Sequence, residues 1–299
     1  MLSAAYAQAA PPLRPQPQLL APRRVCTPKS CSSPAAPQPM NPGSAFLSAR
    51  PDPASQMRLF CFPHAGGGPN FFFQWTQPLG PQIECVRVQY PGRAQRHKEK
   101  PCATVVSLAE EIGSQWHRLS SKPFAFYGHS FGALVAFELA RHLRRQGYPG
   151  PEWLFVGCSR APHLELPFGL IHTLPEDDFI QAIQSRYGEI PADLIRDREL
   201  RAIFIPPLLA DFTAYELYKV APEQPLSIPI TAFAGREDKA ATPASVQEWS
   251  GHTEREFEMI VLPGGHFPAN SSQDLLIRAI RNRLRNLSGP AAQENAHPI

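Results

Sequence analysis

Apolar residues along this chain fall into short runs that alternate with longer stretches of helical periodicity. The runs predict strands at 57–62, 84–90, 123–127, 152–158, 228–235 and 257–263. The periodic stretches predict helices at 104–119, 131–146 and 271–287. Short apolar runs bounded by turn residues are typical of strands covered on both faces. Their alternation with helices predicts an α/β fold, with a mainly parallel sheet flanked by helices.

One interval, about residues 161–225, interrupts this alternation because it holds no convincing strand. Phe179, Ile183 and Tyr187 stand at helical spacing, and a further helix carrying Phe212 is expected beyond a break at 206–207. We expect these helices to form a lid over the carboxyl ends of the strands. Ordinary surface helices are the alternative.

The segments before 57 and after 288 have a different composition. Residues 1–56 hold 12 of the chain's 35 prolines and show no apolar periodicity. Such a segment buries too little surface to offset its ordering entropy, so a disordered tail is expected, and a chain beginning at Met57 should fold like the full one. A transit peptide or a misassigned start would also explain it. Residues 289–299 are expected to be a flexible tail, leaving 57–288 as the domain.

Composition and charge exclude several classes of function. The chain is 43% hydrophobic and 18% charged, which suits a sizeable core. Residues 1–56 carry a net charge of +4 and the whole chain +3, so the domain is near neutral and a nucleic-acid-binding face is not expected. No apolar run has the length of a membrane span, so membrane contact is not expected. The N-terminal segment shows no apolar region with a cleavage site, so we expect a cytoplasmic protein. The six cysteines lack zinc-ligand spacing, and no metal or cofactor is expected.

The sequence Gly-His-Ser-Phe-Gly at 128–132 stands between an expected strand and an expected helix. A sharp turn there would crowd the backbone, which favours glycine on both sides, and would raise the Ser130 hydroxyl above the sheet as a nucleophile. The alternative is a strand-to-helix turn whose glycines only allow tight packing.

A serine nucleophile needs a base and a group that orients the base. His266 follows the strand at 257–263 in a Gly-Gly turn and is the expected base, in preference to His252. Asp238 follows the strand at 228–235 and is favoured as the acid over its neighbour Glu237. Asp211 falls inside the expected lid.

Backbone N–H groups should stabilise the negative charge that develops on the substrate oxygen. We expect one donor at Phe131, directly after the nucleophile. The other is expected at Ala65, in the glycine-rich loop that follows the first strand. His64 and His129 are expected to brace these loops.

Six motifs together resemble a known family: the type II thioesterases that accompany polyketide and nonribosomal peptide synthetases. In order, they read FPHAGGG, YPGR, GHSFGALVAFELA, SRAP, AGREDKA and GGHF. The similarity runs from about Met57 to Leu287. Medium-chain fatty-acid-synthase thioesterases share the set.

This resemblance implies an α/β-hydrolase fold with a helical lid. Ser130, Asp238 and His266 match the family's catalytic triad, and Ala65 and Phe131 its oxyanion donors. The implied substrates are acyl groups on the phosphopantetheine arm of acyl or peptidyl carrier proteins. The implied role is editing of stalled or mis-primed synthase modules. We expect the protein to be a monomer. An esterase or lipase for small free esters and a non-catalytic binding protein are the rival interpretations.

A basic run and two departures from the family pattern complete the sequence-based picture. The carrier proteins that this family acts on are typically acidic. Arg93, Arg96 and Lys98 are therefore expected to form a docking patch at the site entrance. The departures are Leu209, where the family pattern suggests arginine, and Pro268, where a bulkier apolar residue is commoner. Either could alter lid docking or acyl preference.

Overall fold

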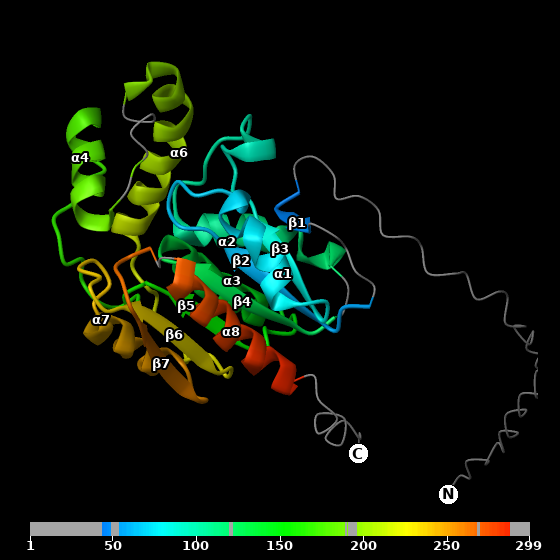
Figure 1. The fold of residues 1–299 in the computed structure, drawn as a ribbon. Coiled ribbons are helices and arrows are strands. Elements are labelled where there is room, and N and C mark those ends of the chain that lie inside the picture. The colour runs from blue at the N-terminus through cyan, green and yellow to red at the C-terminus, as the bar shows by residue number, and fades with distance from the viewer. Residues whose placement is uncertain are drawn as a thin grey trace, which may run out of the picture. The chain divides into compact units, whose positions relative to one another are not determined.

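Seven strands form a single sheet in the order β1-β3-β2-β4-β5-β6-β7 (Figure 1). The computed structural model describes residues 44–48, 54–119, 122–188, 190, 196–267 and 270–287, all within one unit of the chain, Pro39–Ile299. The strands are β1 (Phe46–Ser48), β2 (Met57–Phe62), β3 (Ile83–Val88), β4 (Phe124–His129), β5 (Leu154–Gly157), β6 (Ile230–Gly235) and β7 (Phe257–Leu262). All neighbouring strands in this order are parallel except β1, which is antiparallel to β3. The six strands expected from the apolar runs are confirmed to within two residues.

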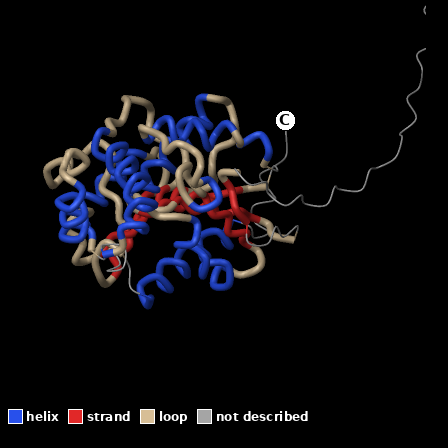
Figure 2. The backbone as a smooth tube through the Cα atoms, turned by 90° about the horizontal axis from the view of Figure 1, so that it is seen from above, coloured by secondary structure: helices blue, strands red, loops and turns tan. Residues whose placement is uncertain are grey.

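Helices cover both faces of the sheet (Figure 2). The α-helices are α1 (Thr76–Leu79), α2 (Val105–Ser114), α3 (Phe131–Arg145), α4 (Glu176–Tyr187), α6 (Arg198–Leu217), α7 (Pro243–Gln247) and α8 (Asn270–Leu287). Short 3-10 helices are η1 (Pro69–Trp75), η2 (Ala94–Arg96), η3 (Trp116–Arg118) and η4 (Glu248–His252). The three helices expected from periodicity are present, the first as α2 followed by η3.

Alternate side chains of the strands enter two separate apolar layers. Phe60 and Phe62 of β2 join the layer under α2 and α3, whereas Leu59 and Cys61 join the layer under α1 and α8. Because both faces are buried, the central strands β2, β4, β5 and β6 are apolar at nearly every position, which is the pattern the sequence displays.

The chain order places a crevice between β2 and β4. From β2 the chain crosses to β3 on one side and then returns to β4 on the other side of β2. At such a reversal the connections after neighbouring strands diverge and leave space outside their carboxyl ends. The loop after β2 and the turn after β4 border this space.

The expectation of disorder up to residue 56 is wrong for part of that segment. Phe46 is only 2% exposed, and β1 pairs with β3 in the register Phe46–Val88. The backbone N–H of Ala45 donates to the Gln115 side chain, and the Ala45 carbonyl accepts from the Gln89 N–H at 2.9 Å. A strand of three residues is too short to produce a visible alternation. Residues 1–43 and the tail from 288 lie outside the described residues.

The expected helix break at 206–207 is also wrong, because α6 runs through both prolines. Proline lacks the N–H that would bond the carbonyl four residues earlier. Those carbonyls belong to Ala202 and Ile203, which are exposed, so water can take the place of the missing donors. Asp197 caps the start of α6 by accepting the N–H groups of Glu199 and Leu200.

The insertion formed by α4 and α6 projects from the carboxyl edge of the sheet (Figure 1). Phe179 of α4 meets Phe212 of α6 edge to face, with ring centroids 5.5 Å apart. Below α6, the Tyr218 hydroxyl donates to Glu138 of α3 at 2.5 Å, which joins the insertion to the main body. Within the described part of the chain, no helix combines the length and apolar character needed to cross a membrane.

Replacing Phe46 with alanine should measure the contribution of β1 to stability. Loss of a buried phenylalanine costs about 3–5 kcal/mol, which corresponds to a fall in Tm of roughly 6 °C or more for a domain of this size. Thermal denaturation of the full chain checks this. Leu47→Ala is the matched control, because Leu47 is only partly buried and should cost less. An unchanged Tm for Phe46→Ala would show that β1 does not belong to the stable core.

Candidate active site

Ser130 lies in a strained turn between β4 and α3. Its φ of 54° and ψ of −117° are unusual for a residue with a side chain. The packing around the turn leaves no room for a side chain at either glycine. A Cβ on Gly128 would lie 2.3 Å from the Gly132 carbonyl oxygen, and a Cβ on Gly132 would lie 2.2 Å from the Phe62 carbonyl oxygen. The Ser130 N–H donates to the Gly157 carbonyl at 2.7 Å. These contacts hold the Ser130 hydroxyl at the carboxyl edge of the sheet.

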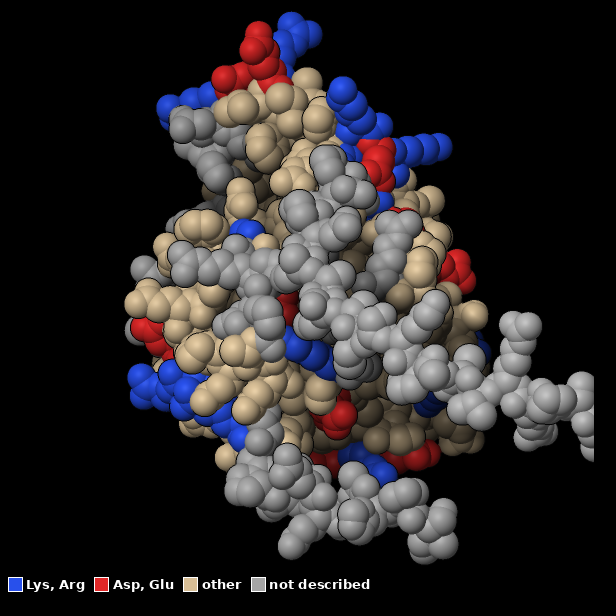
Figure 3. Space-filling model, turned by 90° about the vertical axis from the view of Figure 1, so that its right-hand side faces the viewer, with Lys and Arg blue, Asp and Glu red and all other residues tan. Residues whose placement is uncertain are grey.

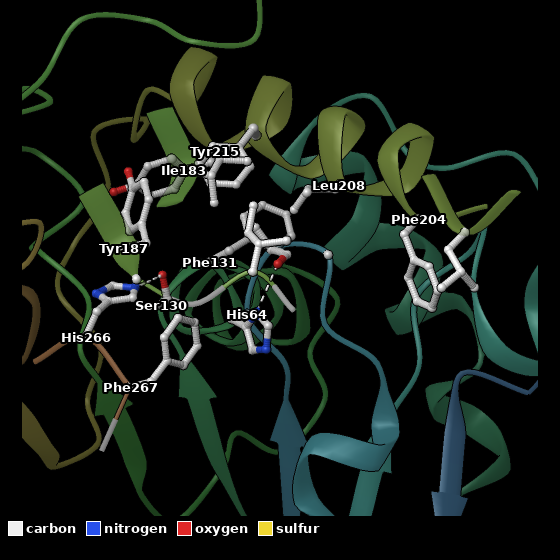
Figure 4. A pocket seen from close by; sticks show the side chains of 16 residues that line it. His64, Ser130, Phe131, Ile183, Tyr187, Phe204, Leu208, Tyr215, His266 and Phe267 are labelled. Atoms are coloured by element: carbon white, nitrogen blue, oxygen red, sulfur yellow. Dashed lines mark hydrogen bonds between the residues drawn. The ribbon is translucent and has the colours of Figure 1, made fainter. Parts of the chain in front are cut away.

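The structure brings Ser130, His266 and Asp238 into one hydrogen-bonded chain. Figure 4 shows its Ser130–His266 contact. His266 Nε2 is 2.9 Å from Ser130 Oγ, and His266 Nδ1 is 2.8 Å from Asp238 Oδ2. Asp238 Oδ1 accepts the N–H groups of Ala240 and Ala241, each at 2.9 Å. With Nδ1–H donating to the carboxylate, Nε2 is left as the acceptor for the serine proton. This is the geometry by which a histidine activates a serine.

The loop after β6 selects Asp238 rather than Glu237. A Cβ on Gly235 would lie 2.2 Å from the Gly265 carbonyl oxygen, so the loops after β6 and β7 meet there directly. The Glu237 N–H donates to the Gly264 carbonyl at 2.9 Å, while its side chain is exposed. Asp238 is the next residue, and its side chain is buried against His266.

Phe131 and Ala65 are the two expected oxyanion donors. Phe131 is the first residue of α3, and the first N–H groups of a helix have no partner within it. Ala65 lies in the turn after β2, and its N–H donates to no other residue that the structure describes. Both residues line the cavity above Ser130.

His64 and His129 lie close to these groups but do not contact the serine hydroxyl. Burial lowers the pKa of His64 to about 4. Its Nδ1 is 2.9 Å from the Ala65 carbonyl oxygen, so Nδ1 carries the proton. Burial also lowers the pKa of His129, whose Nδ1 is 3.2 Å from the Tyr127 hydroxyl and whose ring stacks on Phe267. Neutral rings in these places support the loops around Ser130.

A cavity of about 510 Å³ opens above Ser130 and His266 (Figure 4). Its walls are mostly apolar, and α4 and α6 supply much of them. The residues from these helices include Ile183, Tyr187, Phe204, Leu208, Phe212 and Tyr215. Such a cavity suits an apolar group held next to the serine oxygen.

The expected basic docking patch is wrong for two of its three residues. Arg93 is 8% exposed and makes a bidentate pair with Asp211. Arg96 is 3% exposed and pairs with Glu99 and Glu111. Their partners, apart from Glu99, come from distant parts of the chain, so the run itself could not reveal them.

The remaining patch residue, Lys98, is exposed. On the face drawn in Figure 3, acidic and basic side chains are interspersed and form no field of one sign. Docking of a carrier protein through Lys98 stays a prediction.

Sequence reasoning missed the part played by Asp211, which it assigned only to the insertion. The carboxylate is 3% exposed and accepts the N–H of Gly66 in the loop beside Ser130.

Of the two family departures, Leu209 is a partly buried residue of α6 and Pro268 lies outside the described residues. Within the described ranges, no group of His, Cys, Asp and Glu is arranged to hold a metal ion.

A serine on a strand-to-helix turn, joined to histidine and aspartate on the loops after later strands of a mainly parallel sheet, defines an α/β-hydrolase. The thioesterase-domain family model matches residues 57–284, and the chain belongs to that family.

Its relatives come from biosynthetic systems. It is 36% identical over 245 residues to the gramicidin S biosynthesis protein GrsT of Aneurinibacillus migulanus, covering 82% of this chain and 95% of that protein.

Two solved structures are also similar. The RedJ thioesterase from the prodiginine biosynthetic pathway of Streptomyces coelicolor has a TM-score of 0.70 and 36% identity, covering 85% of this chain and 91% of that one. The type II thioesterase BorB from the borrelidin biosynthetic cluster has a TM-score of 0.71 and 31% identity, covering 81% and 97%.

A fluorophosphonate should label Ser130, and the labelling rate should depend on Asp238. Asp238→Asn should slow labelling by about 10³-fold or more, because the imidazole loses the carboxylate that orients it. The matched control is Glu237→Gln, which changes the neighbouring exposed carboxylate and should leave the rate unchanged. Intact-mass spectrometry over time gives both rates, and Ser130→Ala identifies the labelled position. Slow labelling of Glu237→Gln with normal labelling of Asp238→Asn would reverse the assignment.

Proposed function

We propose that this protein hydrolyses acyl groups from the phosphopantetheine arm of acyl or peptidyl carrier proteins, and so edits stalled or mis-primed synthase modules. The observation that carries the proposal is the chain Ser130–His266–Asp238 beneath an apolar cavity in a member of the thioesterase family. Ser130 is the nucleophile, His266 the general base and Asp238 its orienting group.

Acylation begins when His266 Nε2 takes the proton of Ser130 Oγ as this oxygen attacks the thioester carbonyl carbon. The carbonyl oxygen becomes negatively charged and accepts the N–H groups of Ala65 and Phe131. The carbon–sulfur bond then breaks, and the imidazolium gives its proton to the departing pantetheine sulfur. The products of this half-reaction are an acyl-serine and the free thiol of the carrier.

Deacylation repeats the same steps with water as the nucleophile. His266 takes a proton from water, and the resulting hydroxide attacks the ester carbonyl of the acyl-serine. Collapse of the second tetrahedral intermediate returns the proton to Ser130 Oγ and releases the carboxylic acid. The protons and bonds of both half-reactions are accounted for by the thioester, water and the side chains of this protein.

The surroundings of Ser130 support an apolar acyl group as the substrate. Removing apolar surface from water favours binding by roughly 25 cal/mol per Å², and the walls of the cavity supply such a surface. The α4–α6 insertion forms much of these walls, which supports its role as a lid over the bound chain. The carrier itself stays outside, so only the acyl group and the end of the arm need to enter.

Two finer points belong to the same proposal. The enzyme acts as a monomer in the cytoplasm, where synthase carrier proteins are loaded. Its carrier contacts lie around the cavity entrance rather than on Arg93 and Arg96, since both guanidinium groups are already paired inside the protein.

A medium-chain fatty acyl thioesterase is the second candidate, and the apolar cavity is the observation that favours it. An esterase for small free esters would use the same serine chemistry. The length of the acyl chain and the nature of the leaving group separate these three activities.

The decisive experiment compares kcat/KM for an acyl-carrier thioester with kcat/KM for the p-nitrophenyl ester of the same acyl group. We expect the carrier thioester to be favoured by about tenfold or more, because binding of the remote carrier contributes to transition-state stabilisation. Ser130→Ala should remove both activities by roughly 10³-fold or more. Preference for the p-nitrophenyl ester would support the esterase, and a preference confined to longer free acyl thioesters would support the fatty acyl enzyme.

A further inference from the structure

The turn that carries Ala65 is held from several directions by buried side chains. The Tyr90 hydroxyl donates to the Pro63 carbonyl at 3.1 Å, and the Gly67 N–H donates to the His64 carbonyl at 2.9 Å. Tyr90 is fully buried. These contacts fix both ends of the turn. Between them, the Ala65 carbonyl accepts from His64 Nδ1 at 2.9 Å, and the Gly66 N–H and the Gly67 carbonyl are bound by other groups.

Asp211 and Arg93 bind the Gly66 N–H and the Gly67 carbonyl. Asp211 Oδ2 accepts the Gly66 N–H at 2.7 Å. Arg93 Nη1 donates to the same Oδ2 at 2.6 Å and to the Gly67 carbonyl at 3.2 Å, while Arg93 Nη2 donates to Asp211 Oδ1 at 2.9 Å. A charged pair therefore binds one N–H and one carbonyl immediately after Ala65.

The same face of α6 also presses on Gly66. A Cβ at Gly66 would lie 2.4 Å from Leu208 Cδ1, and the Gly66 φ of +71° favours glycine as well. Leu208 and Asp211 are three residues apart and so share a face of the helix. Helix α6 thus contacts the turn with one apolar and one charged side chain.

Stability alone does not account for this pair. Two charges lose their hydration when they are buried, and the attraction between them often no more than offsets that loss. The guanidinium also lies over the Tyr90 ring, 5.2 Å from its centroid. All of these groups converge on the turn next to Ser130, where backbone geometry matters to within fractions of an ångström.

The geometry points to Asp211 and Arg93 as positioning residues that set the Ala65 N–H as the second oxyanion donor, and this inference rests on the function proposed above. Neither side chain touches the reacting atoms. By binding the Gly66 N–H, Asp211 fixes the orientation of the peptide that follows Ala65. Because Asp211 belongs to α6, the donor is fully set only while that helix is seated on the turn.

The test removes the pair without leaving a lone buried charge. In the double variant Arg93→Met with Asp211→Leu, two apolar side chains of similar size take its place, which often preserves stability. We expect kcat to fall by about 10²–10³-fold, the usual effect of losing one oxyanion donor, while KM changes by less than about threefold. The fluorophosphonate labelling rate should fall in parallel, since its phosphoryl oxygen uses the same donors.

The matched control applies the same substitutions to another ion pair, Arg58→Met with Glu84→Leu. These residues face each other across β2 and β3, with Arg58 Nε 3.0 Å from Glu84 Oε2, near the strand ends remote from Ser130. This variant should keep wild-type kcat and labelling. Thermal denaturation of both double variants shows that each is folded. Should the first fail to fold, Asp211→Asn takes its place, with a fall in kcat of about tenfold or more expected as the charge on the acceptor is lost.

Three readouts keep this inference separate from the proposed function. All variants are assayed with the acyl-carrier thioester, with the p-nitrophenyl ester and by fluorophosphonate labelling. If the wild type cleaves only the ester, the carrier substrate is wrong, but the ester and labelling rates still test the pair. A folded variant of the pair with unchanged kcat and labelling, a loss confined to KM, or an equal loss in the Arg58–Glu84 control would each overturn the positioning role.

Discussion

The close approach of α3 to the ends of β2 and β4 is the constraint on which the site depends. There is no space for a methyl group on Gly128 or Gly132, so the backbone of the first turn of α3 packs directly against the backbone of the strand ends. The chain can make that turn only if Ser130 adopts its strained conformation. The packing of the buried helix α3 offsets this strain. The strained conformation places the Ser130 hydroxyl where the loops after β6 and β7 can reach it. The hydrogen bond between Ser130 and His266 follows from this placement, and His266 in turn is bound by Asp238.

A second constraint is the burial of charge beside the site. Arg93 and Asp211 are as deeply buried as much of the core, although each would be well solvated on the surface. Their charges cancel, and they bond to each other and to one N–H and one carbonyl of a single turn. The insertion and the main body thus share a polar contact in addition to apolar ones, and polar contacts of this kind are directional where apolar packing is not.

Much of this architecture could be predicted from the sequence because its signals are local. Strands buried on both faces are apolar at most positions, and residues after successive strands of a parallel sheet must meet at one edge, which led to Ser130, Asp238 and His266. Three features could not be predicted because their causes are distant or too short. Arg93 pairs with a residue 118 positions away. The strand β1 has three residues in a proline-rich context, and α6 runs through two prolines at a place where the residues four positions before them, Ala202 and Ile203, are exposed.

The strand β1 also has a consequence for association between copies of the protein. β3 would otherwise present a row of unpaired N–H and carbonyl groups along the border of the sheet, and such a row is a template for pairing with another chain. β1 covers that row from Phe46 to Ser48 and, being short and antiparallel, exposes only a small new border of its own. Damage to Phe46–Ser48 would therefore favour aggregation as well as lower stability, even though Ser130 and the cavity above it lie elsewhere.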